Sequence, residues 1–324
     1  MSITIERPDQ LTEVAETEAH WPSARRSQYY RITGNERRDA SRRAQPTVSV
    51  IIPTLNEEKN LPHVLGRLPE GITEVVIVDG HSSDDTIAVA KSLRPDARII
   101  LQDRKGKGNA LACGFAAARG DIIVMIDADG STDPAEIPGF LAPLTAGAEF
   151  VKGSRHMDGG GSSDITLLRS AGNRVLSFTV NTLFGTNYTD LCYGYSAFWR
   201  RCLPNLQITC DGFEVETILN VRAAKAGFRI AEVPSFEQER IYGLSNLNAW
   251  RDGKRVLRAI MTERFSALPE PSDAWKPGFG EIIAGEYTPA TLPAPVQHIS
   301  KPVATALEPE MLGQVARQGR ILAL

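Results

Sequence analysis

Short apolar runs alternate with helical patterns through the first half of the chain. Five runs rich in β-branched residues are closed by polar or glycine-containing segments, as strands buried on both faces of a sheet are. Between them, Leu61, Val64, Leu65 and Leu68 recur with helical spacing, and residues 82–85 precede an alanine-rich stretch as an N-cap would. The predicted strands are residues 48–52, 74–78, 98–101, 121–126 and 149–151.

This alternation predicts an α/β fold with a Rossmann-like, mainly parallel central sheet and helices on both of its faces. A further helix is expected over residues 108–120, where alanines precede Gly120. Residues 229–260 predict a strand, a polar loop and a basic amphipathic helix. That helix has two interpretations, contact with a membrane surface or core packing with a solvated basic face.

The two ends of the chain lack these periods. Seven arginines lie between Arg25 and Arg43, and residues 266–324 hold eight of the 20 prolines. We expect a flexible basic arm over residues 1–46, one folded domain over 47–265, and a Pro-rich, largely irregular tail over 266–324. The arm is interpreted either as a linker or as a segment that touches an anionic membrane.

Composition narrows the choice of partner and compartment. The 324 residues carry 36 Lys and Arg against 39 Asp and Glu, so we expect no nucleic-acid partner. No apolar run approaches the ~18 residues that a membrane span needs, and no leader pattern opens the chain. We therefore expect a cytoplasmic protein with reduced thiols, peripheral at the inner membrane face if it meets lipid. The cysteines are Cys113, Cys192, Cys202 and Cys210.

Polar clusters follow three of the predicted strands. Residues 53–58 read PTLNEE, residues 79–84 read DGHSSD, and residues 127–131 read DADGS. Ligands of parallel α/β sheets bind outside the carboxyl ends of the strands, so these clusters are expected to line one crevice. Asp127 and Asp129 form a DxD motif whose hard oxygens suit Mg²⁺ or Mn²⁺ on a diphosphate.

Five motifs occur in order along the folded part of the chain. They read PTLNEEKNL, VDGHSSDDT, GKGNAL, IDADGSTDP and KGSRHMDGGG. This set resembles the signature of family 2 glycosyltransferases with the GT-A fold, and within them the dolichol- or polyprenyl-phosphate mannosyl- and glucosyltransferase branch. The resemblance covers residues 47–265. It implies an inverting, metal-dependent enzyme that moves a hexose from a nucleoside-diphosphate sugar, of the GDP-mannose or UDP-glucose type, to polyprenyl phosphate.

The resemblance also assigns a donor pocket and a metal site. Asp79 would accept hydrogen bonds from the nucleotide base, and Asp127 and Asp129 would hold Mg²⁺ or Mn²⁺. Ser131 stands where the branch commonly has glutamine and would complete the metal site directly or through water. Independently, Lys107 at a helix start favours an anion. The implied donor-binding residues are Pro53, Leu55, Asn56, Glu57, Asp79, Lys107, Gly108, Asp127, Ala128, Asp129 and Arg240.

Further residues carry the acceptor side of the resemblance. Planar guanidinium groups match phosphate in bidentate fashion, so arginines are expected at the donor and acceptor phosphates. The implied acceptor and phosphate contacts are Arg155, Arg169, Arg240 and Ser245. The implied catalytic carboxylates are Asp127, Asp129, Asp190 and Glu214, while helix capping is an equal interpretation of Asp211 and Glu216.

Two other functions stay open at this point. The same donor chemistry suits a small soluble anionic or natural-product acceptor, at which the arginines would still meet an anion. More remotely, nucleotidyltransferases also place acidic residues at the ends of strands. They normally carry a glycine-rich basic loop after the first strand, where this chain has PTLNEE.

Overall fold

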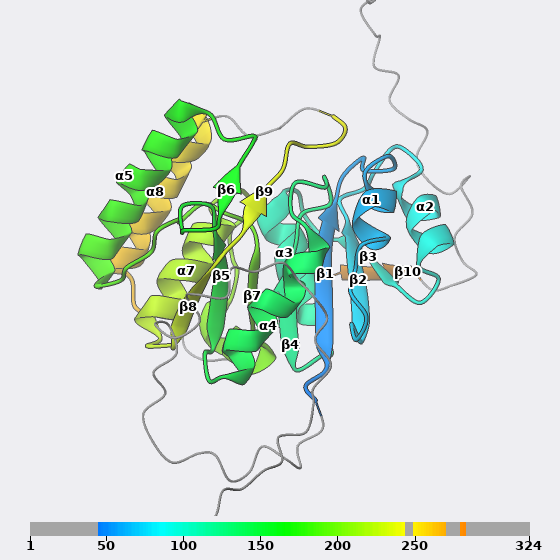
Figure 1. The fold of residues 1–324 in the computed structure, drawn as a ribbon, viewed down its shortest axis with the longest axis horizontal. Helices are drawn as coiled ribbons and strands as arrows, with labels where there is room; N and C mark the ends of the chain where they lie inside the picture. The colour runs from blue at the N-terminus through cyan, green and yellow to red at the C-terminus, as the bar shows by residue number, and fades with distance from the viewer. Residues whose placement is uncertain (1–44, 244–248, 270–278, 283–324) are drawn as a thin grey trace, which may run out of the picture. The chain divides into compact units, whose positions relative to one another are not determined.

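The computed structural model describes residues 45–243, 249–269 and 279–282. Ser245, most of the predicted basic arm and most of the predicted tail lie outside these residues. The strands of the main sheet are β1 (Val48–Thr54), β2 (Glu74–Asp79), β3 (Arg98–Gln102), β4 (Ile122–Met125), β5 (Phe150–Ser154), β7 (Ser196–Trp199), β8 (Ile230–Pro234) and β10 (Phe279–Ile282). Their order across the sheet is β10-β3-β2-β1-β4-β7-β5-β8 (Figure 1).

Parallel pairing dominates this sheet, as predicted. The pairs β1–β2, β1–β4, β2–β3 and β5–β8 are parallel, whereas β7 runs antiparallel to β4 and β5. The register pairs Thr54 with Asp79, so the loops after β1 and β2 leave the same edge of the sheet. The antiparallel strand β10 is a difference from expectation, because it belongs to the segment predicted as an irregular tail and extends the sheet beside β3.

Helices cover both faces of the sheet because successive strand side chains point to opposite sides. Val50 and Ile52 belong to the core under one helical layer, and Ile51 belongs to the core under the other. The first layer is α1 (Leu61–Leu65), α2 (Thr86–Leu93), η2 (Pro134–Glu136) and α4 (Ile137–Thr145). The second is α3 (Lys107–Ala117), η3 (Arg200–Cys202), α6 (Leu203–Leu206) and α7 (Val215–Lys225).

Helix α3 packs closely on the sheet at a glycine. A β-carbon at Gly114 would lie 2.3 Å from Cγ2 of Ile51 and 2.9 Å from Cγ2 of Val78, so only glycine fits there. This contact directs the N-terminus of α3, with Lys107, to the edge where β1, β2 and β4 end. The helix ends at Ala117, which is earlier than the predicted end at Gly120, because Ala118 already has extended backbone angles.

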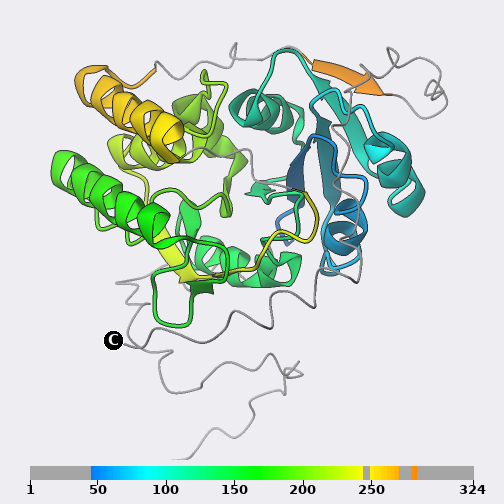
Figure 2. The ribbon, with the colours of Figure 1, turned by 90° about the horizontal axis from the view of Figure 1, so that it is seen from above.

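Two long helices, α5 (Leu167–Phe184) and α8 (Ala249–Phe265), lie side by side at one end of the sheet, next to α7 (Figures 1 and 2). Val180, Val221, Val256 and Ile260 form the core that joins these three helices. A small parallel sheet pairs β6 (Gly161–Ser162) with β9 (Phe236–Glu237). Within the described part of the chain, every helix is too short or too polar to cross a bilayer.

Candidate functional site

The loops after β1 and β2 are tied together at the carboxyl edge of the sheet. The side-chain oxygen of Asn56 accepts a hydrogen bond from the Ser83 amide at 2.7 Å, and the Asn56 amide donates to the Ser82 hydroxyl at 2.9 Å. Asp79 is fully buried, and its carboxylate accepts bonds from the Ser82 amide and hydroxyl at 2.8 and 2.6 Å. The structure thus places Asp79 as an internal support of this loop pair, and its predicted contact with a nucleotide base stays a prediction.

Other predicted donor residues of this edge differ in exposure. Pro53 continues β1 opposite Val78, and Leu55 exposes about half of its side chain. Ala128 is buried in the core on the α1 side of the sheet. Of Pro53, Leu55 and Ala128, Leu55 is the most exposed and so the most accessible to a ligand at this edge of the sheet.

Residues 238–242, which we call the crossing segment, bridge the loops after β1 and β4. The Ile241 amide donates to the Asp129 carbonyl at 3.2 Å, and Asn60 exchanges two hydrogen bonds with the backbone of Tyr242 at 3.0 and 3.1 Å. Gly130 has a φ of 79°, and a β-carbon there would lie 2.5 Å from Cδ1 of Ile241. A glycine in the DADGS turn is therefore required for this crossing.

Arg240 of the crossing segment joins two of the predicted donor loops. Its Nη2 lies 2.8 Å from Oδ2 of Asp129, and its Nη1 lies 3.3 Å from Oε1 of Glu57. The other carboxylate oxygen of Glu57 accepts a hydrogen bond from Asn60 at 2.5 Å. Glu57, Asp129 and Arg240 are thus brought together, and their contact with a donor stays a prediction.

Lys107 lies at the centre of a second charged group. Its Nζ is 2.6 Å from Oδ1 of Asp127 and 2.8 Å from Oε1 of Glu216. Burial disfavours the charged amine, but the two carboxylates outweigh it and hold the pKa of Lys107 above its usual range. Burial raises the pKa of Asp127 to about 6, although Lys107 acts in the opposite direction. The site therefore places a cation beside each aspartate of the DxD motif.

Gly194 leaves the space in which these three charged groups meet. A β-carbon at this position would lie 2.9 Å from Nζ of Lys107, 3.0 Å from Oδ2 of Asp127 and 3.3 Å from Oε1 of Glu216. Any side chain would push the cluster apart. None of the motifs discussed above includes Gly194, because this contact depends on how distant segments of the chain pack together.

The two DxD carboxylates fit Mg²⁺ or Mn²⁺. Asp127 and Asp129 lie two residues apart in the loop after β4, and Oδ1 of Asp129 accepts a hydrogen bond from the Ser131 amide at 2.9 Å. Within residues 45–243, 249–269 and 279–282, no three His, Cys, Asp or Glu side chains gather as a ready metal cage. A cation held by one or two carboxylates plus substrate phosphates and water needs no such cage. The Ser131 hydroxyl stays a predicted third ligand.

Replacing Arg240 by glutamine is expected to tighten Mn²⁺ binding to the donor-free protein. Arg240 shares Oδ2 of Asp129 with any incoming cation. An ion pair of this kind is worth about 1 kcal/mol, which predicts an affinity gain of about fivefold. Electron paramagnetic resonance of free Mn²⁺ during a titration measures this, with exposed Arg119→Gln as the matched control. An unchanged or lower affinity in the Arg240 variant would contradict this competition.

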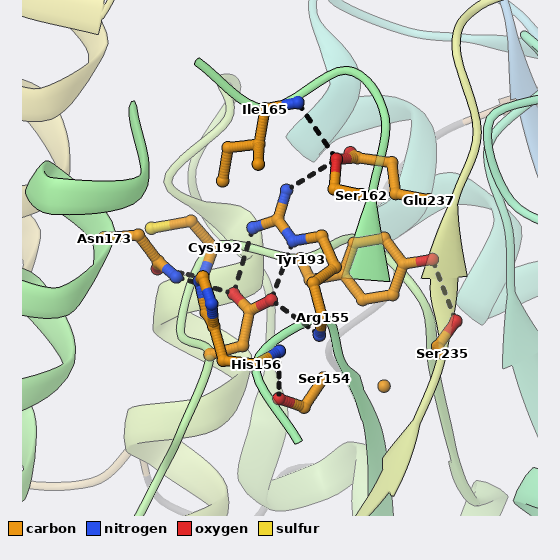
Figure 3. Close-up of polar contacts among 12 residues, drawn as sticks. Ser154, Arg155, His156, Ser162, Ile165, Asn173, Cys192, Tyr193, Ser235 and Glu237 are labelled. Carbon is orange, nitrogen blue, oxygen red and sulfur yellow. Dashed lines mark hydrogen bonds and ion pairs between the residues drawn. The ribbon is translucent and has the colours of Figure 1, made fainter. Parts of the chain in front are cut away.

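The predicted acceptor arginine Arg155 is instead part of a buried cluster (Figure 3). Its Nε and Nη2 contact the two carboxylate oxygens of Asp190 at 2.7 and 3.0 Å, and its Nη1 contacts Glu237 at 3.0 Å. Only 4% of the Arg155 side chain is exposed, and that of Asp190 is not exposed at all. The two residues neutralise each other inside the protein, so the structure gives Arg155 a supporting role rather than the expected phosphate contact.

Asp190 is correspondingly a poor proton acceptor. Burial would raise its pKa, but Arg155 and the buried Lys152 hold it well below its usual range. Asn173 donates a further hydrogen bond to its Oδ1 at 2.9 Å. This carboxylate stays ionised and engaged, which disagrees with its predicted catalytic role. The sequence could not show it, because the partners of Asp190, Arg155 and Asn173, lie in other segments of the chain.

Three other predicted site residues, Arg169, Gly108 and Glu214, also contact other parts of the protein. Arg169, in the first turn of α5, contacts Asp164 at 3.0 Å and keeps about a quarter of its side chain exposed. The Gly108 amide donates to the Asp211 carbonyl at 3.0 Å, so it supports the turn before α7. Glu214 points to Arg255, with 3.7 Å between Oε2 and Nε. Glu216, and not Glu214, lies beside Lys107, and the predicted catalytic role of Glu214 stays a prediction.

Glu216 belongs to the charged group around Lys107, although the sequence analysis did not count it among the site residues. Both Glu214 and Glu216 lie at the start of α7, and composition does not distinguish them. Helical geometry does, because residues two positions apart point to different sides of a helix. The packing of α7 in the fold therefore decides that Glu216 faces Lys107 while Glu214 faces Arg255.

Comparisons with known proteins agree on one family. The family model described as "Glycosyl transferase family 2" matches residues 49–206. Glycosyltransferase AglJ of Haloferax volcanii is 31% identical over 209 residues, which cover 64% of this chain and 68% of that protein. Polyprenol monophosphomannose synthase of Mycolicibacterium smegmatis is 35% identical over 216 residues, which cover 61% and 80% of the two chains.

Solved structures give the same fold. Glucosyl-3-phosphoglycerate synthase from Mycobacterium tuberculosis, in complex with Mn²⁺, uridine diphosphate and phosphoglyceric acid, superposes with a TM-score of 0.56 at 24% identity. The match covers 71% of this chain and 81% of that one. A second complex of that enzyme, with Mn²⁺, uridine diphosphate and glucosyl-3-phosphoglycerate, has a TM-score of 0.55 at 25% identity.

Proposed function

The chain belongs to glycosyltransferase family 2, and we propose that it transfers a hexose from a nucleoside-diphosphate sugar to polyprenyl phosphate, with inversion at the anomeric carbon. Membership of a glycosyltransferase family decides against a nucleotidyltransferase. One observation carries the choice of acceptor, namely the 35% identity to polyprenol monophosphomannose synthase over 80% of that protein. The GT-A fold alone would not identify the acceptor, because one fold can carry many functions.

The charged groups of the crevice support donor binding. Asp127 and Asp129 would hold Mg²⁺ or Mn²⁺, which, when bound, stabilises negative charge on the departing nucleoside diphosphate. Lys107 and Arg240 each lie within 2.8 Å of one of these aspartates and so place two further positive charges beside the diphosphate. Glu57 and the loops after β1 and β2 would contact the nucleoside.

The acceptor side needs positioning more than proton transfer. In the proposed step, an acceptor phosphate oxygen forms a bond to the anomeric carbon while the bond from that carbon to the donor diphosphate breaks. A phosphate monoester is already anionic near neutral pH, so no general base has to remove a proton. The engagement of Asp190 with Arg155 suits such an acceptor. Arg169 is the proposed contact to its phosphate.

Glu216→Gln is expected to lower kcat/KM by about 10- to 100-fold, because misplacing a group that positions the reacting phosphates costs up to about that much. Glu216 holds Nζ of Lys107 at 2.8 Å, and the amide removes one of the two charges that orient this amine. Steady-state transfer assays measure the effect. Glu214→Gln is the matched control, expected to stay within about twofold. A larger loss in the control than in Glu216→Gln would reverse the assignment.

Transfer of labelled sugar tests the proposed function directly. The enzyme is supplied with GDP-, UDP- and dTDP-hexoses, Mn²⁺ or Mg²⁺, and either polyprenyl phosphate or phosphoglyceric acid. Label in the organic phase with one donor, absent in an Asp129→Ala control, supports the lipid acceptor. Label only in a water-soluble product overturns it and favours a soluble anionic acceptor, the kind of ligand in the solved relatives.

A further inference from the structure

Helix α5 exposes large apolar side chains along one side. Leu167, Leu168, Val175 and Phe178 are 91, 58, 64 and 72% exposed. Val175 follows Leu168 by seven residues and Phe178 follows Val175 by three, a spacing that aligns them on one helix face. The opposite face of α5, with Val180, packs into the core between α5, α7 and α8. The exposed row is therefore a second apolar surface, separate from the core.

Helix α8, which packs beside α5, has an exposed apolar row of its own. Trp250, Leu257, Met261 and Phe265 are 72, 45, 41 and 81% exposed and follow one another by seven, four and four residues. Val256 and Ile260 face the core instead. Figures 1 and 2 both show α5 and α8 running side by side at the outer end of the molecule. We call the exposed side of these two helices the α5–α8 face.

The charges on this face are of one sign. The sequence of α5 contains two arginines and no acidic residue. The two acidic residues of α8, Asp252 and Glu263, are only 4 and 5% exposed, and Glu263 is held by Arg222 and Lys225. The described residues of α5 and α8 thus expose no acidic side chain. The exposed basic residues of α8 are Arg251, Lys254, Arg255, Arg258 and Arg264.

We propose that the α5–α8 face docks the enzyme on an anionic lipid bilayer. Apolar side chains in a row, flanked by Lys and Arg, suit insertion at the boundary between headgroups and acyl chains. The basic groups would then meet anionic headgroups. A second copy of this chain fits less well, because two such faces would bring like charges together. The inference goes beyond the proposed function, since docking does not depend on which acceptor is used.

The position of the face relative to the crevice gives docking a consequence for the reaction. Arg169, the proposed acceptor contact, lies in the first turn of α5 directly after the exposed Leu167 and Leu168. A phosphate anchored at a bilayer surface by its lipid chain would therefore meet Arg169 without leaving the headgroup layer.

Co-sedimentation of the full chain with vesicles tests the proposal without any activity assay. We expect binding to vesicles of phosphatidylcholine with phosphatidylglycerol and weaker binding to phosphatidylcholine alone. Trp250→Ser/Phe178→Ser is expected to weaken binding to the anionic vesicles about tenfold, as loss of buried apolar area predicts. Lys254→Gln/Arg258→Gln/Arg264→Gln should weaken it similarly and remove its salt dependence. Exposed Leu93→Ser and Arg119→Gln, both outside the face, are the matched controls.

Three results would overturn the proposal. The first is no binding of the wild type to either vesicle. The second is binding that survives both sets of substitutions, which would assign it to another part of the chain. The third is a dimer, seen by light scattering, that Trp250→Ser/Phe178→Ser converts to a monomer, which would give the face to a second copy. Because all of these side chains are exposed, we expect each variant to keep its fold. Thermal melting of each variant checks this.

Discussion

Asp129→Ala is expected to abolish sugar transfer, with a loss of about a thousandfold or more, while the fold stays intact. The reason is that Asp129 contributes a carboxylate to the predicted metal site and also anchors Arg240 at 2.8 Å. Losing both contacts removes charge stabilisation of about 4 kcal/mol or more from the transition state. The measurement is kcat/KM with the preferred donor and acceptor, together with Mn²⁺ affinity.

The matched control for this prediction is Glu239→Ala in the same crossing segment. Glu239 is exposed and lies next to Arg240, so it tests the loss of a nearby negative charge without removing a site contact. We expect it to stay within about threefold of wild type. Turnover of Asp129→Ala near the wild-type rate would refute the assignment of Asp129 to the metal and donor.

Asp190→Ala is expected to lower the free energy of unfolding by about 3–5 kcal/mol, the largest stability effect that we predict for one side chain. The substitution leaves the guanidinium of Arg155 with only 4% exposure and one remaining carboxylate partner, Glu237. It also removes the acceptor of the Asn173 hydrogen bond. Urea unfolding followed by circular dichroism gives the free energy directly.

Two comparisons separate this buried pair from an ordinary ion pair. Asp164→Ala breaks the more exposed contact with Arg169 and should cost about 1 kcal/mol or less. The double variant Arg155→Met/Asp190→Leu should be more stable than the sum of its single variants predicts, because neither Arg155 nor Asp190 is left buried without the other. A loss below about 1 kcal/mol for Asp190→Ala would contradict the buried position of the pair.

The same pair has a defined pH dependence. Arg155 and Lys152 hold the pKa of Asp190 below its usual range against the effect of burial. A carboxylate of lowered pKa stabilises the fold at pH values above its unfolded pKa, about 4, and this contribution fades as the pH falls below that value. The difference in stability between wild type and Asp190→Ala should therefore be constant near neutral pH and shrink in acid.

Most of the fold could be predicted because local patterns encode it. The runs at residues 48–52, 74–78, 98–101 and 121–126 became β1 to β4, since continuous β-branched runs are typical of strands covered on both faces. Strand β10 escaped prediction because four residues in a proline-rich segment have no period of their own. Pairing with β3, from a distant part of the chain, gives them their conformation.

The site residues likewise fall into those that local sequence patterns predict and those that depend on contacts between distant segments. Residues placed by strand ends, such as Asp127 and Asp129, could be predicted because parallel topology sends every such loop to one edge. Arg155 and Asp190 could not be judged from sequence, because an arginine on a phosphate and an arginine on a buried carboxylate look alike until Glu237 is seen beside it. Glu216 required the orientation of α7, which packing determines.

The pairing of β10 with β3 also determines the order in which the sheet is completed during synthesis. β3 is made early, and its partner β10 follows every other strand and helix described above. Until the ribosome releases residues 279–282, β3 presents an open edge with unpaired backbone groups, the kind of surface that pairs with other chains. This strand, the last that the structure describes, therefore protects β3 against aggregation, and the nascent chain is most prone to aggregate just before residues 279–282 emerge from the ribosome.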